Sequence, residues 1–266
     1  MLQRRRGKDK NEADEITSIR LCFLNYYDKP VRFSLLYRYA AINMTMINYA
    51  LTLSFKGTKY CGWQVQKNAL SVQEVVQDAI EGVFGTRLNL TGCSRTDSGV
   101  HANEYVCNIK STMEIDTCKL PLAINSHLPK DIAVTAARVA EDSFHARYSA
   151  KGKEYIYRIW NSRIHNPFYA ETAYHYPKKI DVEKADLIAS CFVGHHDFSS
   201  FMAAHSKIKD TVREVFYFKA ERDGDFVNLI VAADGFLYNM VRIMCGTVLQ
   251  IISGRIVLPV CDIIAA

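Results

Sequence analysis

The hydrophobic residues of this chain follow two different spacings, and this change of period constrains the fold more than any other feature. Residues 71–84 (SVQEVVQDAIEGVF) place their apolar side chains on one face at helical spacing. Residues 153–160 (KEYIYRIW) instead alternate at period two, as a strand with one buried face does. A chain that contains both patterns is expected to cover a sheet with helices.

Both halves of the chain contain this combination. The first half is expected to form a strand that begins near Asn48, further strands over 105–109 and 132–139, and helices over 71–84 and 120–127. The second half is expected to form a strand over 153–160, a helix that begins at Asp181, a hairpin of residues 212–220 and 226–232 around Asp223–Gly224, and a helix over 236–252. We therefore predict an α+β fold of two halves that share an antiparallel sheet.

The first 45 residues differ from the rest of the chain. They carry nine Lys/Arg and five Asp/Glu, and therefore most of the net charge of +5. We expect residues 1–45 to be an atypical extension, either unstructured or a start-site artefact, followed by one half over residues 46–150 and a second over 151–266. Because the folded part is nearly neutral, binding to a nucleic acid would require a local basic patch.

The use of cysteine and the longest apolar stretch argue against secretion, a metal centre and membrane insertion. The eight cysteines are scattered without a C-x-x-C pair, and no segment resembles a secretory signal peptide. Residues 235–254 are nearly long enough to span a bilayer, but Asn239, Arg242 and Gln250 make insertion costly. We therefore predict a soluble cytoplasmic protein with reduced thiols, no metal and no membrane contact, in which this stretch is a buried helix.

One polar loop carries a candidate catalytic carboxylate. Residues 91–106 (TGCSRTDSGVHANEYV) place Asp97 between two glycines, with Arg95 two residues before it. An aspartate at this place in a loop can equally act as a backbone cap in an Asx-turn. The loop alone therefore leaves a chemical role and a structural role as alternatives.

Two further features indicate a catalytic site only when they are taken together with Asp97. Arg242 is the sole formally charged residue of an otherwise apolar helix, so it either contacts a buried acid or extends to water near an edge. Tyr155 and Tyr157 either pack in a core or present a flat ring and a phenol. An arginine in bidentate contact with Asp97 would keep the carboxylate ionised, and a tyrosine beside it could stack on a planar ring and transfer a proton.

Six segments of the chain occur in the order known from one protein family. They are GTKYCGWQVQKN (57–68), SVQEVVQDAI (71–80), CSRTDSGVHA (93–102), FHARYSAKGKEYIYRIWN (144–161), GHHDFSSF (194–201) and DGFLYNMVRIMCGTVL (234–249). On these segments, which extend from near residue 48 to near residue 250, the chain resembles the tRNA pseudouridine synthase A family. The resemblance implies two fused ferredoxin- or RRM-like halves that share a mostly antiparallel sheet, with helices on one face and an active-site cleft between the halves.

The resemblance also implies an activity and partners. Members of the family are isomerases that convert uridine to pseudouridine in the anticodon stem-loop of tRNA, at positions 38 to 40. The glycosidic C–N bond breaks, the uracil turns, and a C–C bond forms from its C5, without any cofactor. The resemblance further implies a homodimer, and it leaves open which of the three uridines is modified.

Individual residues receive roles from the same resemblance. Asp97 matches the catalytic aspartate, which acts either as a nucleophile on the ribose carbon or through a glycal-type route. Tyr155 matches the tyrosine that stacks on the target uracil and is expected to assist deprotonation at C5, and Arg242 matches the arginine that pairs with the carboxylate. The candidates for RNA contacts are all basic: Arg95, Arg147, Lys56, Lys59, Lys67, Lys151 and Lys153.

The sequence departs from the family pattern chiefly near its C-terminus. The family continues after the apolar helix to a final strand with a Thr-Ala-Pro-like segment. This sequence no longer follows the family pattern after Gly254, and it stops at Ala266. We therefore expect a truncated second half with an unpaired sheet edge. Within the catalytic loop, Ser94 and Ser98 stand where glycine and alanine are usual, and both are small.

Two other functions stay open. The main alternative is a catalytically weak or silent RNA-binding protein on the same fold, because a truncation could remove activity while the fold persists. The other is an aspartic protease, because Asp97–Ser98–Gly99 imitates the D-[ST]-G signature. Such proteases pair two aspartates, and this chain has no second copy of the signature.

Overall fold

The computed structural model describes residues 45–204 and 208–264. The predicted extension over residues 1–45 lies outside these residues except for Thr45. From Ile47 onward the chain forms one compact unit.

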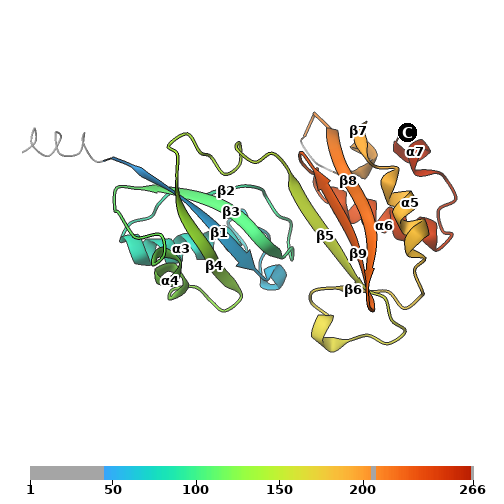
Figure 1. The fold of residues 1–266 in the computed structure, drawn as a ribbon, viewed down its shortest axis with the longest axis horizontal. Coiled ribbons are helices and arrows are strands. Elements are labelled where there is room, and N and C mark those ends of the chain that lie inside the picture. The colour runs from blue at the N-terminus through green and yellow to red at the C-terminus, as the bar shows by residue number, and fades with distance from the viewer. Residues whose placement is uncertain (1–44, 205–207, 265–266) are drawn as a thin grey trace, which may run out of the picture. The chain divides into compact units, whose positions relative to one another are not determined.

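The first sheet has four strands in the order β2-β3-β1-β4 (Figure 1). They are β1 (Ile47–Phe55), β2 (Thr91–Gly92), β3 (Ala102–Ser111) and β4 (Ile132–Ala140). All of their pairings are antiparallel. β1 is the strand that the sequence predicts near Asn48, and its odd-numbered side chains from Tyr49 to Phe55 are buried in the core of this half.

Two helices contribute to that core. They are α3 (Val72–Phe84) and α4 (Leu120–Asn125), which precedes β4. A short 3-10 helix, η1 (Gly57–Lys59), lies before α3 in the chain. The Ser71 hydroxyl accepts the backbone N–H of Glu74 at 3.2 Å, so Ser71 is the N-cap of α3 and the predicted start of this helix is confirmed. The buried face of α3 then packs in one core with β1 and β3.

The chain that follows β4 covers part of the opposite face of β1. Asn48 is buried there and donates from Nδ2 to the backbone oxygens of Glu141 and Phe144, both at 2.8 Å. Asn108 donates to the Asn48 side chain at 3.0 Å and accepts the backbone N–H of Ala146 at 2.9 Å. The two asparagines fasten this segment to the sheet, because a buried amide without a partner would be costly.

The second sheet has five strands in the order β6-β5-β9-β8-β7. They are β5 (Lys153–Trp160), β6 (Tyr174–His175), β7 (Gly194–Asp197), β8 (Val212–Asp223) and β9 (Phe226–Ala233). β5 and β6 are parallel, and the other pairs are antiparallel. β8 and β9 form the predicted hairpin, but Asp223 pairs with Phe226, so the turn residues are Gly224, at φ +57°, and Asp225.

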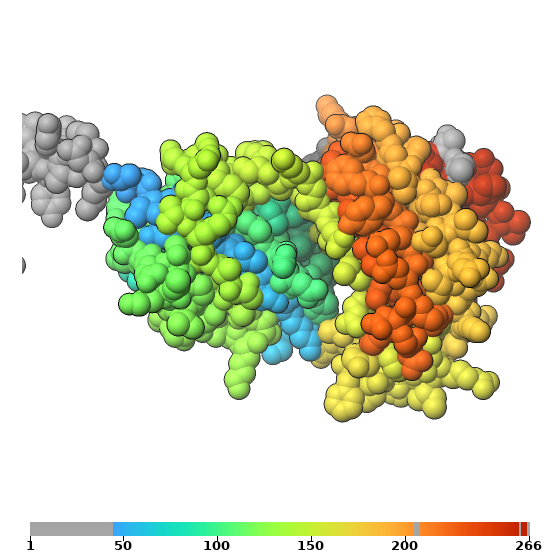
Figure 2. Space-filling model, viewed as in Figure 1, coloured from blue at the N-terminus to red at the C-terminus, as the bar shows by residue number. Residues whose placement is uncertain are grey.

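Two helices pack on one face of this second sheet. α5 (Val182–Ser190) is capped by Asp181, which accepts the backbone N–H of Lys184 at 3.1 Å. α6 (Met240–Ile252) shares a core with α5, β8 and β9. Shorter helical segments are η2 (Pro167–Tyr169), η3 (Ser199–Phe201) and α7 (Val260–Ile264). The other side of β8, drawn in orange, is open to solvent in the space-filling view (Figure 2).

The α+β class and the mostly antiparallel pairing are confirmed, and one detail is corrected. The halves do not share one hydrogen-bonded sheet, because no strand pairing joins β4 to β5 among the described residues. Residues 141–152, which would have to continue the ladder, form no strand and are held in part by Asn48 and Asn108. The domain boundary at residues 150 and 151 and the cleft between the halves stay predictions.

One expectation for the C-terminal region is corrected, and the predicted truncation stays a prediction. α6 begins four residues later than predicted, because Asn239 adopts a left-handed conformation, at φ 59°, at the N-cap. Beyond α6 the chain adds α7, whose Val260 is buried in the second core. None of the helices in the described part of the chain is long and apolar enough to cross a membrane.

Replacement of Ser71 by alanine should lower the free energy of unfolding by roughly 0.5–2 kcal/mol, because the first turn of α3 would lose its cap. Urea unfolding monitored by circular dichroism measures this change. Ser200 is exposed in η3, and Ser200→Ala is a matched control that should stay within about 0.5 kcal/mol of the parent. Equal stability of the two variants would contradict the assigned cap.

Candidate active site

The polar loop that carries Asp97 is held by backbone contacts to the residues before α3. Trp63 donates its backbone N–H to the oxygen of Thr96 at 3.2 Å, and Gly99 donates to the oxygen of Tyr60 at 3.2 Å. The Ser98 hydroxyl also reaches the Tyr60 oxygen, at 3.4 Å. The loop has no regular structure of its own, so these contacts fix the backbone on both sides of Asp97.

Two glycines permit this close approach. A Cβ at Gly62 would lie 2.4 Å from the backbone oxygen of Thr96, and the residue has a φ of +81°. A Cβ at Gly57 would lie 2.0 Å from the backbone oxygen of Val100. Any side chain at these positions would therefore displace the loop.

A pair of stacked rings supports the start of the loop. Tyr105 accepts the backbone N–H of Ser94 at 3.3 Å through its phenol oxygen and donates to the backbone oxygen of the same residue. Its ring stacks on Trp63, with centroids 4.2 Å apart. Both side chains are buried, so Ser94 is positioned by the core rather than by solvent-exposed contacts.

The carboxylate of Asp97 is partly withdrawn from water. Burial raises its pKa above the ordinary aspartate value, while a hydrogen bond from the backbone N–H of Asn239 and the charge of Arg242 lower it, and the net direction is upward. Asn239 is the N-cap of α6, so the positive end of the helix dipole lies near the carboxylate. The site therefore combines a desolvated acid with groups that favour its charged form.

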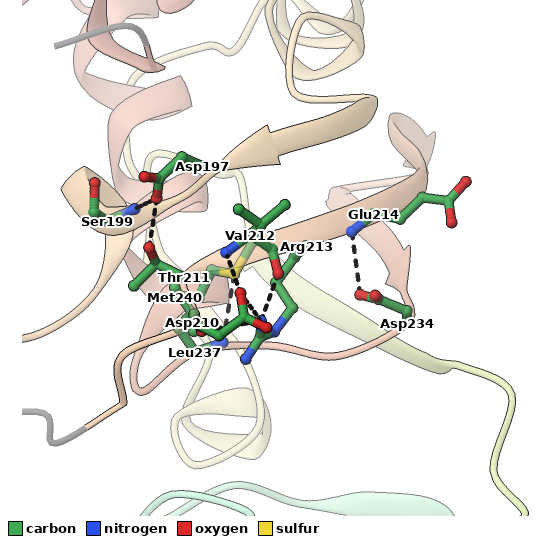
Figure 3. Close-up of polar contacts among 10 residues, drawn as sticks. All are labelled: Asp197, Ser199, Asp210, Thr211, Val212, Arg213, Glu214, Asp234, Leu237 and Met240. Carbon is green, nitrogen blue, oxygen red and sulfur yellow. Dashed lines mark hydrogen bonds and ion pairs between the residues drawn. The ribbon is translucent and has the colours of Figure 1, made fainter.

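The segment between β9 and α6 is tethered at its start, at Asp234 (Figure 3). Asp234 exchanges two hydrogen bonds with Glu214: its side chain accepts the Glu214 N–H at 3.2 Å, and its own N–H donates to the Glu214 oxygen at 3.1 Å. Lys153 donates to the backbone oxygen of Asp234 at 3.2 Å. Further along, the backbone N–H of Leu237 points to the sulfur of Met240 at 3.5 Å.

Arg242 differs from the expectation of a buried, bidentate partner. Its side chain is exposed in the first turn of α6 and donates to the backbone oxygen of Ser98 at 3.1 Å. Among the described residues no ion pair within 4.0 Å joins it to Asp97. It acts on the carboxylate through its charge and by contacting the residue that follows Asp97.

Tyr155 lies near the same carboxylate. Burial raises the pKa of its phenol, a hydrogen bond with the Ser94 side chain lowers it, and the charge of Asp97 raises it, with a net upward shift. The Tyr155 ring also meets the edge of Phe236, with centroids 5.2 Å apart. Tyr155 and Tyr157 both pack against the second core. Tyr155 therefore packs in the core and also lies near Asp97.

The basic candidates do not form one cluster. Arg95 and Arg147 are both exposed and line one pocket of about 200 Å³. Lys56 and Lys59 line a different pocket, and each contacts an acid: Lys56 pairs with Glu171, and Lys59 lies 3.5 Å from Asp131. The remaining candidates are Lys67 and Lys151, which are exposed, and Lys153, which is half-buried against Asp234.

Gly57, Gly62, Tyr105 and Asn239 were not predicted from the sequence to support the site. Asn239 carried the clearest available signal, since asparagine is a preferred N-cap and tolerates the left-handed region better than most residues. Gly57 and Gly62 gave a weaker sequence signal, because a glycine in a loop does not by itself indicate a positive φ or a close neighbour. Their importance depends on contacts with the distant loop at residues 94–100.

The surroundings of Asp97 bear on the aspartic protease alternative, and the distribution of possible ligands bears on a metal site. A protease dyad would raise the pKa of one aspartate through a second carboxylate, whereas burial is the only cause that raises the pKa of Asp97. No group of three or more histidine, cysteine or acidic side chains able to hold a metal ion occurs in the described ranges.

Most of the chain is similar to a known family and to individual proteins. A family model described as tRNA pseudouridine synthase matches residues 52–149 and 188–263. The tRNA pseudouridine synthase A of Thermoanaerobacter sp. (strain X514) is 46% identical over 211 residues, which cover 79% of this chain and 86% of that protein. The corresponding protein of Acetivibrio thermocellus is 42% identical over the same length and coverage. The tRNA pseudouridine synthase A 2 of a Bacillus cereus strain is 38% identical over 212 residues, or 79% and 86% of the two chains.

Gly62→Ala should destabilise the protein more than Gly85→Ala. Both glycines have positive φ, +81° and +68°, so each alanine bears a left-handed backbone cost of roughly 1–2 kcal/mol. Only at Gly62 would the new Cβ also meet a backbone oxygen, whereas nothing lies within 4 Å at Gly85. We expect an additional loss of about 1–3 kcal/mol for Gly62→Ala in denaturant unfolding. Equal losses of unfolding free energy for the two variants would contradict the assigned contact, because the loop at residues 94–100 would then move away from Gly62 without cost.

Asp97→Asn should leave the Tm at pH 7 unchanged or raised. Because the folded-state pKa of Asp97 lies above its unfolded value, the protonated carboxyl stabilises the fold, and this contribution is lost as pH rises through the folded-state pKa. Asparagine suffers no such loss, so its advantage should grow from about pH 4 to pH 7 in scanning calorimetry.

Asp197→Asn is an aspartate control of opposite sign. Hydrogen bonds from Thr211 and Ser199 lower the pKa of Asp197 (Figure 3). That carboxylate therefore stabilises the fold above its unfolded pKa, and the asparagine variant should lose Tm at pH 7 but approach the parent in acid. A decrease for Asp97→Asn as large as that for Asp197→Asn would contradict the assigned effect of burial.

Proposed function

The chain belongs to the tRNA pseudouridine synthase family, and we propose that it isomerises uridine to pseudouridine in the anticodon stem-loop of tRNA, at positions 38 to 40, with Asp97 as the catalytic carboxylate. The observation that carries the proposal is the environment of Asp97. This carboxylate is half-buried, receives the N–H of the Asn239 N-cap, and lies in the field of Arg242. Carboxylates whose pKa is shifted by burial and by a charged neighbour in this way are concentrated at functional sites.

The chemistry requires one group that acts at the sugar. The C1′–N1 bond of uridine breaks, the uracil turns, C1′ bonds to C5, and the proton from C5 is replaced by one on N1, so the product is an isomer. Asp97 either attacks C1′ to form a covalent intermediate or removes the proton of C2′ on a glycal-type route. Both roles use the ionised carboxylate, which Asn239 and Arg242 stabilise against the effect of burial.

Tyr155 is suited to hold the uracil and to serve as a proton donor. Because its pKa is raised, the phenol stays protonated at neutral pH, and a phenolate base is disfavoured. A uridine must leave its stack before C1′ and C5 can be reached, at a cost of a few kcal/mol. Stacking on an aromatic ring returns about 1–3 kcal/mol, so a ring beside Asp97 would offset that cost.

We propose a cytoplasmic homodimer as the working form, on the resemblance to the family. Light scattering coupled to size exclusion measures the oligomeric state. A catalytically weak or silent RNA-binding protein on the same fold remains the alternative. Asp97, Tyr155 and Arg242 weigh against it, because an RNA-binding protein without activity has no chemical use for these groups.

The proposal predicts tritium release from an unmodified tRNA that carries [5-³H]uridine in its anticodon arm, because formation of the C–C bond removes the hydrogen at C5. The parent chain should release tritium, and Asp97→Asn should reduce the rate by at least about a thousandfold. Transcripts that retain a single uridine at position 38, 39 or 40 would identify which sites are modified. Activity of the parent should fall in acid as Asp97 is protonated, beginning above the range of an ordinary aspartate.

Asp225→Asn makes the same chemical change at an exposed turn and should retain the parent rate. If the parent binds the tRNA tightly but releases no tritium, the silent RNA-binding protein becomes the correct description. Undiminished activity of Asp97→Asn would assign the chemistry to another residue.

A further inference from the structure

A second pocket lies beside the Asp97 loop. It has a volume of about 200 Å³ and shares Ser94 and Arg95 with that loop, but Asp97, Tyr155 and Arg242 are not among its lining residues. The pocket is therefore a neighbour of the proposed reaction site and not the site itself. Its opposite wall comes from His145, Arg147 and Tyr148, which belong to the segment between β4 and β5.

The short turn that carries these three residues is rigidly built. The backbone N–H of Ser149 donates to the oxygen of His145 at 2.8 Å, and the Ser149 hydroxyl accepts the His145 N–H at 3.1 Å. Nδ1 of His145 accepts the backbone N–H groups of Arg147 and Tyr148, at 3.2 and 3.3 Å. Just before Arg147, the buried Asn108 holds the N–H of Ala146 at 2.9 Å. The turn is thus anchored to the sheet.

This anchored turn holds an aromatic ring in solvent. The Tyr148 side chain is 80% exposed, and its ring stacks on His145 with centroids 4.3 Å apart. Arg95 and Arg147 in the same pocket are exposed as well. Gln64, also in the lining, donates to Gln73 at 2.9 Å, which leaves its amide oxygen able to accept a hydrogen bond. An aromatic face, two guanidinium groups and an amide are the groups that bind an unstacked nucleotide.

We propose that this pocket is a second nucleotide-binding subsite, which takes one unpaired nucleotide of the tRNA next to the target uridine, with its base stacked on Tyr148 and its phosphate contacted by Arg95 and Arg147. The inference rests on the proposed function. Arg95 lines the pocket and lies two residues before Asp97 in the same loop of the protein. An RNA strand that brings its uridine to Asp97 would therefore pass Arg95 with a neighbouring nucleotide. The subsite would hold the RNA strand in place while the target uridine is extruded.

Steady-state kinetics on unmodified tRNA test the subsite. Tyr148→Ala should raise KM by roughly 5- to 100-fold with little change in kcat, because one base-stacking contact is lost. Tyr148→Phe keeps the ring and should behave as the parent. The matched control is Phe168→Ala, since Phe168 is 89% exposed in η2 outside this pocket. All variants should keep the Tm of the parent, because the replaced side chains are largely in solvent.

A direct probe is an anticodon stem-loop RNA in which 2-aminopurine replaces, one at a time, each loop nucleotide next to the target uridine. The full chain carrying Asp97→Asn should quench the fluorescence at one such position, and addition of Tyr148→Ala should abolish that quenching. An active parent whose KM and quenching are unaffected by Tyr148→Ala would overturn the subsite and leave the proposed function intact. Absence of RNA binding and of tritium release by the parent would overturn both.

Discussion

The site depends on how closely the loop around Asp97 approaches the residues that precede α3. Glycine at positions 57 and 62 allows backbone to lie against backbone, at distances that a single Cβ would prevent. The loop then satisfies its amides and carbonyls with Tyr60 and Trp63 instead of with a strand or helix partner. A segment without regular structure thereby becomes fixed, and the carboxylate that it carries has a defined direction.

Two opposing effects act on the carboxylate of Asp97. Withdrawal from water destabilises the charged carboxylate, whereas the N-cap of α6 and the guanidinium of Arg242 stabilise it. The stabilising groups belong to the second half, where Asp234 ties the start of the helix segment to Glu214 and Lys153. The environment of this half-buried carboxylate is thus built by both halves, although only one of them supplies the residue.

Much of the fold could be predicted because the signals were local. The helix starts at Ser71 and Asp181, the period-two strand that contains Tyr155, and the β8–β9 hairpin all depend on short stretches, and each is confirmed. Alternatives stayed open where the outcome depends on surroundings. The apolar helix allowed Arg242 either to contact a buried acid or to extend to water, and the second holds, because Arg242 lies in the first turn of α6 and is exposed.

The sequence by itself determined the main strands and helices, the helix starts at Ser71 and Asp181, and the segments that resemble a single family. These properties depend on spacing within about a dozen residues, and hydrophobic period and capping report them directly. Only the tertiary structure decided that the Asn239 N–H meets Asp97, that Arg242 reaches Ser98 across 144 positions of the chain, and that Tyr148 stands beside Arg95. Contacts of this kind are set by the packing of whole sheets and helices, and no local pattern encodes the distance between them.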